Sequence, residues 1–136
     1  LQSEAYACSV NMTSGGAQTL TGAYAHLSYF LTGENRTYEP FGQHGAHFGR
    51  TVPHSNFFIV PGAISPGAWE LKTRYSNLNF DHIDKGQYND ITTGFNWYLN
   101  DRTRVMFDWI HPVTTSQTTY GATQSDLLAM RFDFNW

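Results

Sequence analysis

The sequence predicts an all-β fold, and within that class an antiparallel transmembrane β-barrel, from three observations. Apolar and polar residues alternate strictly over residues 69–76, which is the period of a β-strand whose successive side chains point to opposite faces. Aromatic residues make up 16% of the 136 residues and charged residues only 14%, whereas charged residues are about 25% of an ordinary soluble domain. No apolar run approaches the roughly 18 residues of a membrane helix, which excludes helical spans and leaves a barrel open.

Six segments are predicted as strands because they combine this alternation with aromatic and β-branched residues between polar turn segments. They cover residues 1–10, 19–31, 67–79, 88–99, 103–111 and 125–136. Only the sequence Asn-Asp-Arg at 100–102 separates the fourth strand from the fifth, which predicts a tight hairpin. Strands of about 9–12 residues, joined by short and long connections in alternation, are typical of a transmembrane barrel.

Residues 32–67 break this rhythm with a long connection that is rich in Gly, Pro and His and has no clear period. In a barrel with an even number of strands both termini lie in the periplasm, so counting back from the last strand puts both ends of this connection on the periplasmic side. Its large apolar side chains are too many to hang free in water. We therefore expect it to enter the lumen, pack its aromatic side chains on the inner wall and narrow the pore, with Arg36 or Arg50 near the opening. A flap resting on the periplasmic rim is the alternative.

The two faces of the predicted strands differ in chemistry. One face is aromatic and aliphatic, and we assign its aromatic members to the lipid or to the interfacial girdle: Trp69, Tyr75, Phe95, Trp97, Phe107, Trp109, Phe132, Phe134 and Trp136. The other face is polar or small, and we assign its charged members, with two arginines of the connection, to the pore lining: Arg36, Arg50, Glu70, Lys72, Arg74, Arg104, Asp108 and Arg131.

The C-terminal sequence RFDFNW favours lipid over a protein core as the environment of the apolar face. Outer-membrane barrels commonly end on such a strand, because the barrel assembly machinery reads it and its aromatic residues sit in the interfacial girdle. A soluble β-sandwich binding module, with the same face packed on a core, remains the alternative.

Four stretches resemble consecutive motifs of the phosphate-selective porin O and P family: GAYAHLSYFLTGENRTY, GAWELKTRYSNLNF, TTGFNWYLNDRTRVMFDW and DLLAMRFDFNW. The similarity runs through nearly the whole chain from Gly22 onward. It implies a homotrimeric, 16-stranded porin of the bacterial outer membrane, in which residues 1–136 would form the C-terminal segment of a single barrel domain and supply its last six strands. It also implies that the basic anion-binding ladder of the family lies mostly upstream of this sequence.

The expected function is diffusion of small hydrophilic solutes, including anions such as phosphate, through this porin. The expected partners are outer-membrane lipid, the solutes, the assembly machinery and two further copies of the chain. Charges on the polar face of the strands are mixed, and a strong filter uses a ring of one sign, so this part of the wall supports at most a mild anion preference. A plugged barrel with a purely structural role is a further alternative.

No catalytic residue, cofactor or metal is expected. Glu70 and Asp108 have the chemistry of an acid/base pair, but beside basic residues on the same face they are better explained as pore-lining charges. The net charge of −3 without a basic block gives nucleic-acid binding no support, and the single Cys8 excludes an intrachain disulfide.

The connection also holds side chains with metal-ligand chemistry but no helix to present them together. These are Glu39, His44, His47 and His54. We interpret them as ordinary loop residues.

Overall fold

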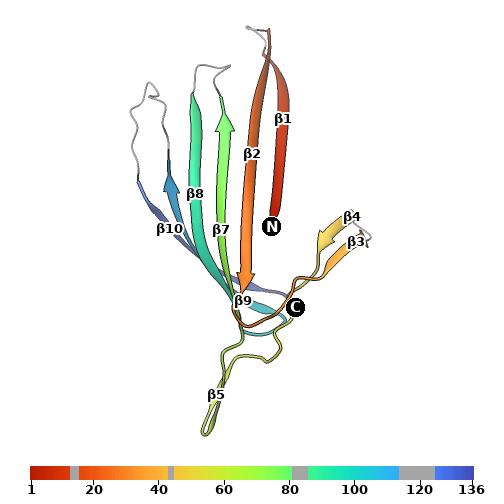
Figure 1. Ribbon diagram of the computed structural model, residues 1–136, viewed down its shortest axis with the longest axis vertical. Helices are drawn as coiled ribbons and strands as arrows, with labels where there is room; N and C mark the ends of the chain where they lie inside the picture. Colours follow the sequence, from red (N-terminus) through yellow and green to blue (C-terminus); the bar gives the residue numbers. More distant parts are fainter. Residues whose placement is uncertain (13–15, 43–44, 81–85, 114–124) are drawn as a thin grey trace. The chain divides into compact units, whose positions relative to one another are not determined.

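The computed structural model describes residues 1–12, 16–42, 45–80, 86–113 and 125–136, and these residues form strands and no helix. The described part therefore contains no helix long and apolar enough to cross a membrane. Six long strands dominate it: β1 (Gln2–Met12), β2 (Gly16–Phe30), β7 (Ala68–Asn79), β8 (Gln87–Tyr98), β9 (Thr103–Pro112) and β10 (Leu127–Phe134). They are hydrogen-bonded in the order β1-β2-β7-β8-β9-β10 (Figure 1).

This sheet confirms the predicted all-β antiparallel fold and its six strands, whose ends lie within three residues of the predicted ones. β1 and β2 pair antiparallel from Gln2 opposite His26 to Met12 opposite Gly16. The tight β8–β9 turn is closed by a backbone hydrogen bond of 3.0 Å from Leu99 N to Thr103 O. Within it the Asn100 side chain accepts a hydrogen bond from Arg102 N at 2.8 Å, which is the usual reason for Asn at such a position.

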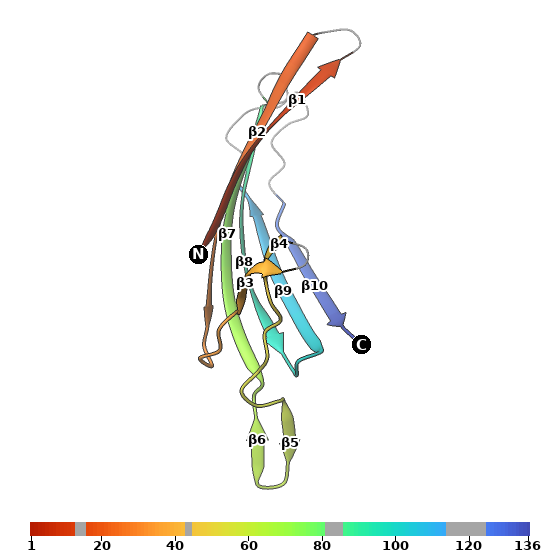
Figure 2. The same cartoon turned by 90° about the vertical axis from the view of Figure 1, so that its right-hand side faces the viewer.

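The connection between β2 and β7 contains two short hairpins that the sequence did not predict. The first pairs β3 (Tyr38–Gly42) with β4 (Gly45–Phe48), and the second pairs β5 (Phe58–Val60) with β6 (Ala63–Ser65) (Figure 2). Strands of three to five residues are too short to show an alternation above chance.

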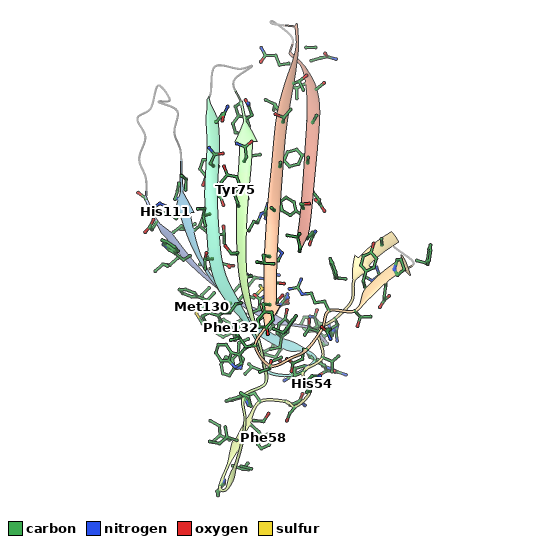
Figure 3. All side chains as sticks on the ribbon, in the orientation of Figure 1. His54, Phe58, Tyr75, His111, Met130 and Phe132 are labelled. Carbon is green, nitrogen blue, oxygen red and sulfur yellow. The ribbon has the colours of Figure 1, made fainter. Side chains whose placement is uncertain are left out.

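The chain divides into two compact units. The first comprises residues 1–27, 73–93 and 108–129, and the second residues 28–72, 94–107 and 130–136. In the first unit the side chains of residues 21–27 alternate between exposed and half-buried or buried along β2. The Arg74 guanidinium lies 4.2 Å from the centre of the Tyr24 ring, on the less exposed side. Tyr75, the next residue along β7, is half-exposed (Figure 3).

In the second unit a row of aromatic rings crosses three neighbouring strands. Trp69 of β7 stacks on Trp97 of β8 at 5.1 Å between ring centres and lies 5.4 Å from Phe95. Phe95 in turn stacks on Phe107 of β9 at 5.6 Å. These distances are those of favourable aromatic pairs. Because residues two apart on a strand share a face, these four rings define one side of the sheet here, which we call the aromatic face.

Candidate functional site

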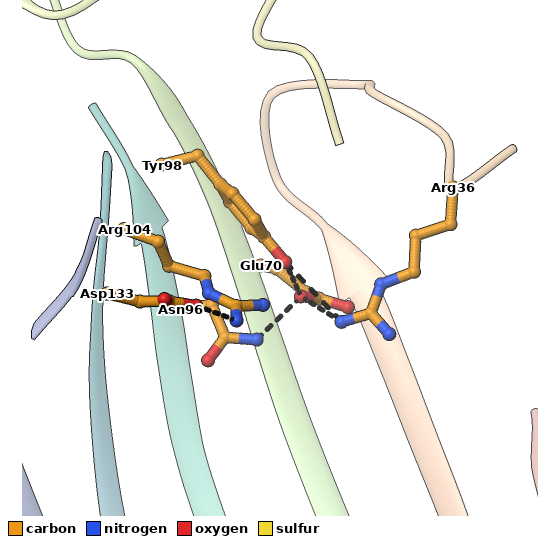
Figure 4. A network of polar contacts seen from close by, with 6 residues as sticks. All are labelled: Arg36, Glu70, Asn96, Tyr98, Arg104 and Asp133. Carbon is orange, nitrogen blue, oxygen red and sulfur yellow. Dashed lines mark hydrogen bonds and ion pairs between the residues drawn. The ribbon is translucent and has the colours of Figure 1, made fainter. Parts of the chain in front are cut away.

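The opposite side of the sheet in the second unit carries a network of buried polar side chains centred on Glu70 (Figure 4). Glu70 is one residue from Trp69 on β7, so strand geometry turns it away from the aromatic face. Its side chain is completely buried, and its Oε2 accepts hydrogen bonds from Asn96 Nδ2 at 2.7 Å and Tyr98 OH at 2.9 Å, both on β8. Arg36 from the connection completes the set with Nη2 at 2.8 Å from the same oxygen.

These contacts favour the charged form of the buried carboxylate through one of its oxygens, Oε2, whereas Oε1 has no hydrogen-bond partner in the part of the chain that the structure describes. A buried charge is costly unless an opposite charge and hydrogen bonds replace the lost water. Glu70 has both, and the Arg36 side chain that supplies the charge is itself only 26% exposed. The network therefore fixes the beginning of the connection against β7 and β8.

A second ion pair extends the polar side across β9 and β10. Arg104 Nη2 lies 2.5 Å from Asp133 Oδ2. The Arg104 guanidinium also lies 5.6 Å from the centre of the Tyr98 ring, which places it beside the Glu70 network. The polar side in this unit is thus a chain of paired charges that runs from the connection through four elements of the sheet.

Near its beginning the connection is held by a second group of hydrogen bonds around Glu34, which is buried. Its carboxylate accepts hydrogen bonds from the Thr32 hydroxyl and, at 3.2 Å, from His54 N. Thr32 Oγ1 also accepts a hydrogen bond from Trp69 N at 3.0 Å. Burial by itself raises the pKa of Glu34, but the hydrogen bonds from Thr32 and His54 outweigh it and leave the pKa below its usual range.

A cavity of about 270 Å³ lies between the connection, the β8–β9 turn and the end of β10. Phe48 and Tyr98 are among the residues that line it. Its charged lining residues, four basic and two acidic, are Arg36, Arg50, Arg102, Arg104, Asp101 and Asp133.

The four arginines of the cavity differ in their partners. Arg36 is paired with Glu70 and Arg104 with Asp133, and Arg102 Nε lies 3.9 Å from the adjacent Asp101. Arg50 is exposed and forms no ion pair with any residue that the structure describes. It is therefore the guanidinium best placed to bind a dissolved anion, because no carboxylate competes for its five donors.

The predicted pore-lining residues fall into two groups. The structure brings Arg36, Arg50, Glu70 and Arg104 together around this cavity and its neighbouring network. The remaining four are not part of the cavity lining: Lys72 is half-buried on β7, Arg74 covers Tyr24, Asp108 is half-buried on β9, and Arg131 is exposed on β10.

Among the predicted lipid-facing residues, Trp69, Phe95, Trp97 and Phe107 make up the aromatic face described above. On β9 the Trp109 ring lies 5.5 Å from the His111 ring. The others are exposed: Tyr75, Phe132, Phe134 and Trp136.

The structure does not gather the aromatic residues of the connection on one side of the sheet. Phe57 instead packs edge-on against Trp97 of the aromatic face, with ring centres 4.9 Å apart. Phe58 is 41% exposed in its hairpin, and Phe41 is 97% exposed. The reason is that the connection is split between the two sides of the sheet, which its sequence does not reveal.

Sequence reasoning missed Asn96 and Tyr98 as members of the network. The signal was present, since both occupy the polar parity of β8, as Glu70 does on β7. Their pairing with Glu70 requires the register between the two strands, which the alternation alone does not give.

The side chains with metal-ligand chemistry are not gathered. His44 lies outside the described residues. His47 Nε2 is 3.6 Å from Glu39, whereas His54 Nδ1 is 3.6 Å from Glu34. No group of three or more potential ligands occurs among the residues that the structure describes.

Two of the comparisons with known proteins indicate the same family. The sequence model of the phosphate-selective porin O and P family matches residues 1–136. Porin O of Pseudomonas aeruginosa is 30% identical over an alignment of 110 residues that covers 71% of this chain and 22% of that protein. An uncharacterized protein of Caulobacter vibrioides is 36% identical over 83 residues, 61% of this chain and 15% of that protein. No solved structure matches the chain significantly. The chain thus spans less than a quarter of the length of either curated relative.

Proposed function

The chain belongs to the phosphate-selective porin O and P family, a family of outer-membrane porins, and from this premise we propose that it forms part of a pore wall through which small hydrophilic solutes diffuse. The observation that carries the proposal is that the two sides of the sheet in the second unit bear different kinds of side chain. Four stacked or tilted aromatic rings occupy one side, and a network of paired charges around the buried Glu70 occupies the other. A porin wall needs this arrangement, because one side meets lipid and the other meets a water-filled lumen.

The complete barrel is part of the same proposal. Six strands cannot close a barrel, whose small end is about eight strands, so the remaining strands come from elsewhere in a longer protein. We propose a 16-stranded, homotrimeric barrel in the outer membrane, assembled through recognition of its aromatic C-terminal strand. Residues 1–136 supply six of its strands.

We further propose that the first part of the connection, described over residues 32–42 and 45–51, lies in the lumen and narrows it. The ion pair between Arg36 and Glu70 supports this placement, because it holds the connection on the charged side of the sheet. The cavity that Arg50 shares with Arg104 and Asp133 supports it as well.

Arg50 is proposed as the residue that gives this region a mild preference for anions. Arg50→Gln should lower the ratio of anion to cation permeability of the full-length protein, because it removes the one guanidinium of the cavity that has no described carboxylate partner. Arg50→Lys is the matched control, since it retains the charge and should retain most of the preference. Reversal potentials in planar bilayers under a salt gradient provide the measurement.

Two results would contradict this proposal. A correctly folded full-length protein without channel activity would exclude the porin function. An unchanged permeability ratio in Arg50→Gln would leave the pore in place but remove Arg50 from its selectivity.

A further inference from the structure

The second short hairpin of the connection has an unusual surface. β5 and β6 pair Phe58 with Ser65, Ile59 with Ile64 and Val60 with Ala63, and the turn between them is Pro61-Gly62. Gly62 has a φ of +84°, which suits glycine at the second central position of a turn that begins with proline. We call residues 58–65 the apolar ribbon.

The base of the ribbon is attached to the aromatic face rather than to the polar network. Pro66 O accepts hydrogen bonds from two indoles, Trp97 Nε1 at 2.7 Å and Trp69 Nε1 at 3.1 Å. On the other leg, Phe57 N donates to Leu99 O at 2.6 Å. The hydrogen bonds at Pro66 and Phe57 therefore fix both ends of the ribbon to Trp69, Trp97 and the end of β8.

Gly67 permits this close attachment. Its φ is +67°, and a Cβ atom at this position would collide with the backbone oxygen of Tyr98. A side chain here would therefore push the ribbon off the end of β8.

Both sides of the ribbon carry exposed apolar side chains, although Ser65, which shares a side with Phe58, is polar and buried. Phe58 and Val60 project to one side, and Ile59 and its partner Ile64 to the other, because neighbouring residues on a strand alternate. Ile59 is 68% and Ile64 74% exposed. The sequence carries no charged residue from Ser55 to Trp69. The ribbon is therefore continuous in chemistry with the aromatic face to which it is attached.

We propose that the apolar ribbon is a membrane-interface anchor that lies among the phospholipid headgroups next to the Trp69–Trp97 pair. Lipid surrounds an inserted element and can cover both sides of the ribbon, whereas a protein partner docked on one side would leave the other in water. The outer edges of a two-stranded ribbon have unpaired backbone groups, so it belongs in the hydrated interface and not in the hydrocarbon. Tryptophan pairs at this level are typical of the same zone.

This inference rests on the outer-membrane location proposed above and goes beyond it. The test uses the full-length protein, folded and conducting, with Cys8 and any other cysteine replaced by serine. Single cysteines at Ile64→Cys, Leu71→Cys and Phe41→Cys carry an environment-sensitive fluorophore. Leu71 reports the outer wall, and Phe41, 97% exposed at the other hairpin, reports a position expected in water.

The labelled proteins are placed in phosphatidylcholine vesicles with nitroxides near the top of the acyl chains, or with iodide in solution. Interfacial elements bury their apolar side about 5–10 Å deep, so the lipid nitroxides should quench the emission at Ile64→Cys by roughly half or more. The label at Leu71→Cys should be quenched in the same way, and that at Phe41→Cys by iodide instead.

Each of the other possible results would contradict a specific part of the proposal. Iodide quenching at Ile64→Cys, with lipid quenching retained at Leu71→Cys, places the ribbon in water. Protection of Ile64→Cys from both quenchers means that protein, such as a second copy of the chain, covers it. Absence of lipid quenching at Leu71→Cys shows that the side of β7 that carries Leu71 and the aromatic face does not meet lipid, which overturns the anchor as well.

Discussion

Glu70 is the side chain on which the polar network depends at the scale of single residues. Its position was predictable, because the alternation around it assigns it to the side opposite Trp69 and Leu71. Its environment was not, since three donors from two other segments converge on one oxygen only once the register and the connection are in place. The sequence therefore identified a charge on the polar face, and the structure identified why that charge is kept.

The ion pair between Arg36 and Glu70 should show strong energetic coupling. Arg36→Met leaves Glu70 charged, fully buried and without its cation, and breaking a buried pair in this way costs about 3–5 kcal/mol. Because Arg36 is partly exposed, we expect a loss of about 3 kcal/mol in the free energy of unfolding of the full-length protein. The double variant Arg36→Met/Glu70→Gln should recover most of it, as the stranded charge is gone. Urea unfolding in lipid vesicles measures the free energy of unfolding of each variant. If the double variant loses as much as the two single variants together, Arg36 and Glu70 are not coupled.

Glu34 should make the stability of the connection depend on pH. Its pKa in the folded chain lies below the usual 4.5, so its ionised form stabilises the fold above that pH. The contribution is lost as the pH falls through the lowered pKa. The difference in unfolding free energy between the wild type and Glu34→Gln should therefore shrink between about pH 6 and pH 3. If the difference in unfolding free energy stays constant with pH, the charge of Glu34 does not contribute to it, and the effect of the substitution comes from altered packing or hydrogen bonding.

At the scale of elements, the six long strands were predictable and the two short hairpins were not. The long strands have enough residues for the period of two to be unmistakable, and their turns carry Asn and Gly. The second hairpin, for example, combines the Pro61-Gly62 turn with a hydrogen bond from Trp97 Nε1 on a long strand to Pro66 O at its base. Those attachments join residues far apart in sequence, and no local pattern encodes them.

The two hairpins should differ in their effect on conductance. Thr37 O and Gly49 N are hydrogen-bonded at 2.7 Å, so residues 38–48 can be replaced by a short Gly-Ser link without moving their ends. This deletion should raise single-channel conductance, because the segment lies beside the charged cavity. Replacing residues 58–65 in the same way is the matched control, and it should leave conductance unchanged. Equal conductance in wild type and both variants would place the first hairpin outside the lumen.

At the scale of the whole molecule, the function proposed for the sheet depends on which of its sides meets water in the pore. The family, the aromatic face and the paired charges support the same assignment, and neighbouring residues of β7 offer the sharpest comparison. Arg74 lies over Tyr24 on the polar side, and Tyr75 points to the opposite side and is half-exposed.

The most direct test is therefore the single-channel current of the full-length protein carrying Arg74→Cys or Tyr75→Cys in a cysteine-free background. A small, negatively charged thiol reagent is added from solution to an open channel in a planar bilayer. We predict stepwise changes in the current of Arg74→Cys, because each modified thiol places a new charge in the lumen, and no change for Tyr75→Cys, whose thiol faces lipid. A response of Tyr75→Cys without one of Arg74→Cys, or the absence of any channel, would contradict the account.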